Sequence, residues 1–203
     1  MKEVLPINST ATADLAPPRI SEIVLKTSRF DVMRDWYQLV LSATRTFEYD
    51  VPGQKPHGDD RAVDFHRLCF LRIFWQFPYT EVLALFEVPD LCKVERSTGL
   101  HHMQFRLGSL DALADRHERL SGFGIEPYKS YNHGPSTSFY YEDPDANLVE
   151  LSGSNFESEE AYKAFFSSPG FAKNPAGVLI DPAAFIAALR SGADRDELVR
   201  LPS

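Results

Sequence analysis

Hydrophobic and polar positions change period several times in the first half of the chain. Residues 22–27 form a short apolar run typical of a strand, and residues 31–41 place Met33, Trp36, Tyr37 and Val40 at the spacing of an amphipathic helix. Three further segments, 44–49, 68–76 and 82–88, are rich in β-branched, leucine or aromatic residues and predict strands. The pattern therefore predicts a βαβββ order over about residues 19–90.

The same order returns in the second half. A strand is predicted at 102–107, then a helix at 110–120 closed by Gly122 and Gly124. Three more strands follow near 126–131, 136–142 and 148–151. An offset of eighty residues superimposes the two opening strands, although few residues are identical. We therefore expect an α+β fold built from paired βαβββ modules, about 19–90 and 100–153.

The remaining segments flank or interrupt these modules. Residues 1–18 lack a period and end in Pro17-Pro18, which predicts a flexible N-terminal arm. Residues 51–64 form a polar insertion. After residue 153, helices are predicted at 159–166 and 182–189, with stop signals at Gly170 and Gly192. We expect one domain at 19–153, with 154–203 as its C-terminal helical extension.

Composition narrows the classes of partner. The 203 residues are 43% hydrophobic and 25% charged, as in an ordinary globular protein, and carry a net charge of -8. This charge and the lack of a basic patch disfavour nucleic acid and membrane surfaces as partners. Cys69 and Cys92 cannot form a disulfide framework or thiolate zinc site, and neither a signal peptide nor a long apolar run is evident. We therefore expect a cytoplasmic protein.

Two segments of the second half carry a resemblance to a known superfamily. One strand opens with His102-Met-Gln-Phe, and residues 143–151 read Asp-Pro-Asp-Ala-Asn-Leu-Val-Glu-Leu. With the paired modules, residues 20–152 resemble the vicinal oxygen chelate superfamily of glyoxalases, bleomycin resistance proteins and extradiol dioxygenases. Residues 132–144 are similar to a segment of the small one-domain type I extradiol dioxygenases. Phosphate-binding loops, GxSxG elbows and HExxH pairs are absent from the sequence.

The resemblance implies a cup of curled mixed sheets around a divalent metal, with Glu22, His102 and Glu150 as ligands. Imidazole and carboxylate donors suit iron(II), our first expectation, and also manganese, nickel or zinc. Extradiol dioxygenases supply a histidine where this chain has Glu22. The additional carboxylate favours harder metal ions. The alternative is that Glu22 is a surface residue and that the metal is lost or weakly held.

The local sequence supports the other two ligands. Strand alternation should point His101 and His102 to opposite faces, so only His102 is expected to enter the cup. Glu150 lies between Val149 and Leu151, where a buried carboxylate would need a cation to compensate its charge. The alternatives are a hydrogen-bonded His102 at a strand end and a solvated Glu150 facing outward.

The resemblance also implies two catalytic side chains, His133 and Tyr140. An imidazole can take and return a proton near neutral pH, and a phenol can donate a hydrogen bond to an oxygen at the metal. Each has a plainer alternative. His133 lies in a turn-like Asn-His-Gly-Pro segment where it could simply be solvated, and Tyr140 lies in an aromatic run that could fill the core.

The leading hypothesis is a metal-dependent extradiol-type dioxygenase that cleaves a catecholic aromatic substrate with O2. An isomerase, epimerase or lyase of the glyoxalase type is the first alternative, because Glu22 could shuttle a proton beside a carbonyl polarised by the metal. A metal-free small-molecule binding protein is the second. The expected partners are a small aromatic substrate and O2, and a homodimer, common in this superfamily, stays open.

Overall fold

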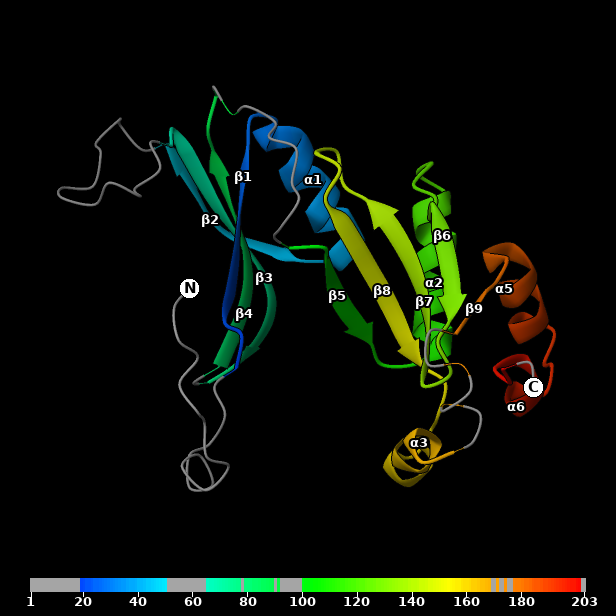
Figure 1. The fold of residues 1–203 in the computed structure, drawn as a ribbon. Coiled ribbons are helices and arrows are strands. Elements are labelled where there is room, and N and C mark those ends of the chain that lie inside the picture. Colours follow the sequence, from blue (N-terminus) through cyan, green and yellow to red (C-terminus); the bar gives the residue numbers. More distant parts are fainter. Residues whose placement is uncertain are drawn as a thin grey trace, which may run out of the picture.

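The computed structural model describes residues 19–50, 65–77, 79–89, 91, 100–168, 171, 174 and 177–201. Within them, helices and strands follow the predicted order, and the two sheets lie side by side (Figure 1). None of the described helices is long and apolar enough to cross a membrane. The predicted arm at 1–18, the insertion at 51–64 and the stop signal at Gly170 lie outside the described residues.

The first module runs through β1 (Glu22–Thr27), α1 (Phe30–Leu41), β2 (Thr44–Asp50), β3 (Arg67–Gln76) and β4 (Tyr79–Glu87). These strands form a four-stranded sheet in the order β1-β4-β3-β2, which we call the first sheet. β1 is parallel to β4, and the other neighbours are antiparallel.

The second module repeats this plan through β5 (His102–Leu107), α2 (Leu110–Ser121), β6 (Lys129–Asn132), β7 (Ser136–Glu142) and β8 (Leu148–Ser154). The strand order is β5-β8-β7-β6-β9, and β5 is parallel to β8 as β1 is to β4. We call this the second sheet. The predicted α+β fold of paired βαβββ modules is confirmed.

The two helices explain why each sheet has one buried face. In α1, the buried residues Phe30, Met33, Tyr37 and Val40 recur at helical spacing and pack on β3 and β4. In α2, Ser109 caps the first turn by accepting a hydrogen bond from the Ala112 amide. The buried faces of both modules join in one hydrophobic core.

A buried hydrogen bond connects the modules within this core. The Tyr37 hydroxyl of α1 donates to Asp143 Oδ2, in the turn between β7 and β8, at 2.7 Å. Asp143 also accepts bonds from the backbone amides of Asp145 and Asn147, so its carboxylate is well satisfied. Removing either partner of this hydrogen bond should therefore destabilise both modules.

The C-terminal extension adds α3 (Glu159–Phe166), β9 (Val178–Leu179), α5 (Pro182–Arg190) and α6 (Arg195–Leu198). Both predicted helices are present, whereas β9 and α6 were not predicted. β9 pairs with β6 and so extends the second sheet. α5 and α6 lie beside that edge (Figure 1).

Candidate functional site

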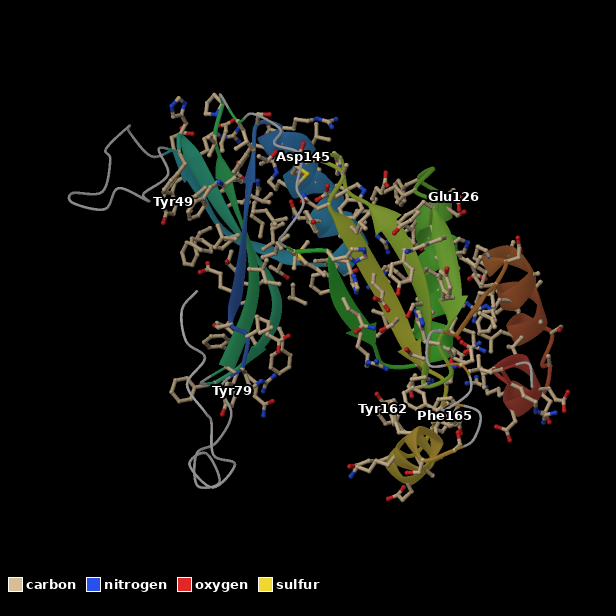
Figure 2. All side chains as sticks on the ribbon, in the orientation of Figure 1. Tyr49, Tyr79, Glu126, Asp145, Tyr162 and Phe165 are labelled. Atoms are coloured by element: carbon tan, nitrogen blue, oxygen red, sulfur yellow. The ribbon has the colours of Figure 1, made fainter. Side chains whose placement is uncertain are left out.

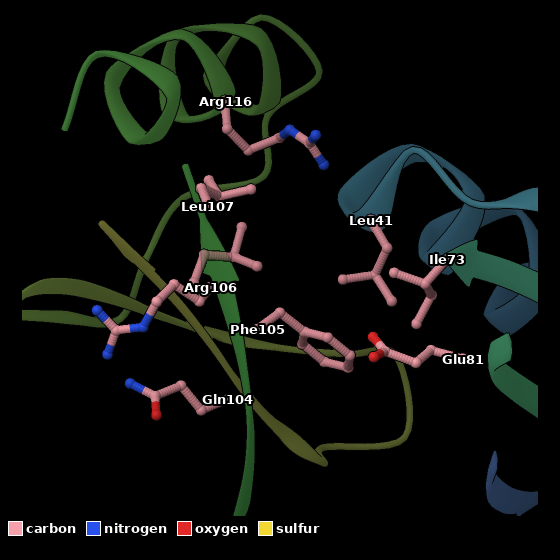
Figure 3. Close-up of a pocket in the computed structure, with 9 residues that line it drawn as sticks. Leu41, Ile73, Glu81, Gln104, Phe105, Arg106, Leu107 and Arg116 are labelled. Carbon is pink, nitrogen blue, oxygen red and sulfur yellow. The ribbon is translucent and has the colours of Figure 1, made fainter. Parts of the chain in front are cut away.

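The second sheet has a polar face turned away from its helix. On β5, Phe105 and Leu107 point toward the core, whereas Gln104 and Arg106 point to the opposite side (Figure 3). On the polar side, cross-strand pairing places four residues in one row across four strands. We call this the site row, and from β5 to β6 it consists of Gln104, Glu150, Tyr140 and Lys129.

His102 and Glu150 meet at one end of this row. His102 Nε2 lies 3.0 Å from Glu150 Oε2, and the Glu150 side chain is only 4% exposed. The Gln104 amide donates to the other oxygen, Oε1, at 2.8 Å. A carboxylate this buried needs compensation, and an imidazole nitrogen beside it completes a donor pair suited to a divalent cation. These two side chains therefore supply donor types that suit the implied metal.

The arrangement of His101 corrects an expectation from strand alternation. We expected the two neighbouring imidazoles to lie on opposite faces, but His101 Nδ1 is 2.7 Å from His102 Nδ1. The reason is that β5 begins at His102, so His101 precedes the strand and is not held by its pleat. His101 is therefore available to orient the His102 ring through its second nitrogen.

His133 and Tyr140 lie next to this pair. His133 Nε2 is 2.9 Å from the Tyr140 hydroxyl, and the Tyr131 ring stacks on the His133 ring with an interplanar angle of 8°. Burial raises the pKa of Tyr140, and the charge of Glu150 and a hydrogen bond to it raise the pKa further. Tyr140 therefore stays a neutral hydrogen-bond donor around neutral pH.

The turn that carries His133 is held in place by the C-terminal extension. Asn132 donates to the Val199 carbonyl at 2.7 Å and accepts from the Gly134 amide at 2.8 Å. Gly134 has φ of +93°, and a Cβ there would clash with the ring of Phe165 of α3, which is labelled in Figure 2. Residues far along the chain thus fix the backbone on both sides of His133.

Glu22 is the predicted ligand that the structure does not bring to this cluster. It opens β1 on the first sheet, is exposed, and pairs with Val82 of β4. Within the described ranges, no group of three histidine, cysteine or acidic side chains could hold a metal ion. Glu22 does occupy the position in β1 that His102 occupies in β5, on the face without helices.

Sequence reasoning missed Gln104 and Lys129. Gln104 lies two residues after His102 in the same strand, so alternation alone could have placed both on one face. Lys129 carries no comparable signal, because its position depends on the pairing of β6 with β7 opposite Tyr140. A tertiary register of this kind is not visible in a single sequence.

A cavity of about 260 Å³ lies between the modules beside this site (Figure 3). Leu41 and Ile73 line it from the first module and Phe105 from the second, while Glu81 and Arg116 add charged groups. Gln104 of the site row also lines the cavity, whereas His102 and Glu150 do not. The cavity therefore adjoins the candidate site at Gln104 and does not contain the two candidate metal ligands.

Comparison with known proteins identifies the family of the chain. Residues 19–151 match the model of the Glyoxalase/Bleomycin resistance protein/Dioxygenase superfamily. The chain is 35% identical to biphenyl-2,3-diol 1,2-dioxygenase 2 of Rhodococcus globerulus, over 90% of this chain and 87% of that protein. It is 30% identical to biphenyl-2,3-diol 1,2-dioxygenase 3 of the same organism, over 89% and 87% of the two chains.

Among solved structures, a glyoxylase/bleomycin resistance protein/dioxygenase domain from Frankia sp. EAN1pec aligns with a TM-score of 0.51 and 17% identity. The alignment covers 68% of this chain and 99% of that domain, and at this identity it supports the fold alone. The family assignment rests on the match to the family model and on the two dioxygenase relatives. The chain belongs to the glyoxalase/bleomycin resistance protein/dioxygenase superfamily.

Proposed function

We propose that this protein is an extradiol-type dioxygenase that opens the ring of a catechol with O2. The observation that carries the proposal is the cluster of His102, Glu150, Tyr140 and His133 on one polar face. Two relatives named as biphenyl-2,3-diol dioxygenases support this reaction class. We place the activity in the reducing cytoplasm, where the two cysteines and iron(II) would stay reduced.

His102 and Glu150 would hold the metal, iron(II) in our proposal. When bound, the metal would supply Lewis acidity and adjacent positions for the catechol oxygens and O2. His133 is positioned to accept a hydroxyl proton from the catechol and to return it, while its contact with Tyr140 sets the direction of its ring. Tyr140, kept protonated by burial, donates a hydrogen bond to an oxygen at the site.

We propose Glu22 as a third ligand contributed by the first sheet. The support is its equivalence to His102 in the repeat and its place on the face without helices. Binding through Glu22 would require the first and second sheets to approach each other around the ion. Glu22→Gln should then lower metal affinity, whereas Glu81→Gln, on β4 of the same sheet, should leave metal affinity unchanged.

The direct test is oxygen consumption by protein loaded with iron(II) under anaerobic conditions and then mixed with a panel of small and bulky catechols. We expect ring cleavage by the wild type and a loss of at least about a hundredfold in Glu150→Gln. Glu142→Gln, at the exposed end of β7, is the matched control. No oxygen uptake with any catechol would refute the proposal.

A non-oxidative metal enzyme is the second candidate, and Glu22 is the observation that favours it. A carboxylate in place of a third neutral ligand could serve as the base that moves a proton beside a carbonyl. Its signature would be solvent deuterium entering a hydroxycarbonyl compound without oxygen uptake. Absence of exchange across such compounds would count against this candidate.

A further inference from the structure

Lys129 lies at the end of the site row, inside a cluster of tyrosines. Its Nζ is 4.6 Å from the ring centroid of Tyr140, 5.3 Å from that of Tyr128 and 5.7 Å from that of Tyr131. β6 pairs Lys129 directly with Tyr140, so the ammonium is held over the ring that flanks the candidate metal ligands. The half-buried lysine thus faces the site.

This ammonium has no acidic partner within the described ranges. Glu150, two strands away, is engaged by His102 and Gln104, and Glu142, the diagonal neighbour on β7, forms no ion pair with Lys129. Arg106 on the same face also lacks a described carboxylate partner. By contrast, elsewhere in the chain Arg34, Arg67, Arg190 and Arg195 each pair with carboxylates.

The spacing suits one substrate that reaches both ends of the row. Neighbouring strands lie about 4.8 Å apart, so the backbones of Lys129 and Glu150 are separated by about 10 Å. A catechol with its hydroxyls at the His102 and Glu150 end would direct a ring substituent over Tyr140 toward Lys129. The tyrosine rings would cover the aromatic ring, and the ammonium would meet the substituent.

Building on the proposed function, we propose that the substrate is a catechol bearing a carboxylate substituent, and that Lys129 binds this carboxylate. Cation–π contacts hold an ammonium in place and leave its N–H donors able to bond a substrate acceptor. A carboxylate accepts from these donors in a charge-assisted hydrogen bond, which is stronger than a neutral one. A neutral ring substituent at the same place would make no such bond.

The test compares methyl and carboxylate at the same ring position. Protein loaded with iron(II) is titrated anaerobically with 4-methylcatechol and 3,4-dihydroxybenzoate, and with 3-methylcatechol and 2,3-dihydroxybenzoate. We expect the wild type to bind at least one carboxylate more tightly than its methyl counterpart. Lys129→Met should lower the affinity for that carboxylate compound by about 10- to 100-fold. The affinity for the methyl compounds should stay within about twofold of the wild-type value. Lys163→Met, on the exposed face of α3, is the control.

Two results would overturn the inference while the proposed function stands. One is a wild type that binds and cleaves the methylcatechols at least as well as the carboxylates. The other is a Lys129→Met variant whose circular dichroism spectrum shows that it is folded, but whose affinity for both classes of compound falls equally. Lys129 would then act only by orienting Tyr140. If neither class binds the loaded wild type, the proposed function itself fails and this inference falls with it.

Discussion

Replacing Gln104 with methionine isolates the contribution of one amide to the candidate metal centre. The Gln104 amide donates to Glu150 Oε1 at 2.8 Å and to Ser152 Oγ at 3.3 Å. Methionine has a similar length and would keep the carboxylate covered, but it cannot donate. Glu150 would then keep its contact with His102, while its Oε1 would lose the hydrogen bond from the Gln104 amide.

The expected magnitude follows from the burial of that carboxylate. Glu150 is 3% exposed, so water cannot readily replace the amide. A hydrogen bond to a charged group contributes about 1.5–3 kcal/mol. If that bond fixes the carboxylate in its metal-binding orientation, its loss corresponds to about a 10- to 100-fold lower metal affinity, as for other residues that orient metal ligands.

Competition with a chromophoric chelator under anaerobic conditions measures this affinity directly for iron(II) and manganese(II). Gln76→Met, at the exposed end of β3, is the control and should bind metal as the wild type does. Circular dichroism of the metal-free proteins checks that both variants fold. Metal affinity of Gln104→Met within about twofold of the wild type would refute the positioning role of Gln104.

Three further predictions concern stability and reactivity. Tyr37→Phe removes a buried donor to Asp143 and should lower the free energy of unfolding by about 2 kcal/mol in urea titrations. Burial raises the pKa of Glu48, but hydrogen bonds and charges from its arginine neighbours outweigh it and lower the pKa overall. Glu48→Gln should therefore lower the free energy of unfolding by about 1 kcal/mol at pH 7 and by less as the pH falls below 4.5. An equal loss of stability at low pH would contradict this prediction. Burial raises the pKa of the Cys69 thiol to about 11, so in a Cys92→Ser background Ellman's reagent should label it at pH 8 only after unfolding.

The strand and helix order could be read from the sequence because both modules carry clear periods. The strands at 22–27, 102–107 and 136–142 and the helix at 159–166 begin and end where the pattern predicts. β9 is different, since two residues cannot show a period and are ordered only by pairing with β6. β6 begins at Lys129 and ends at Asn132, whereas the pattern predicted residues 126–131, because pairing with β7 and β9 defines this strand.

The candidate site was predictable where chemistry and alternation agree. His102 and Glu150 combine a ligand type with a strand position on the polar face, and the structure places them in contact. The predicted orientation of His101 was wrong because side chains alternate between faces only within a strand, and His101 precedes β5. The roles of Gln104 and Lys129 depend on cross-strand register, which one sequence does not reveal.

Metal content is the measurement that tests the central claim most directly. Wild type and Glu150→Ala would be purified without oxygen or chelator, and their metals determined by elemental analysis. The account predicts close to one divalent ion per chain, iron in first place, in the wild type and its loss in the variant. Equal metal in both proteins, or no stoichiometric metal in the wild type, would contradict a centre at His102 and Glu150.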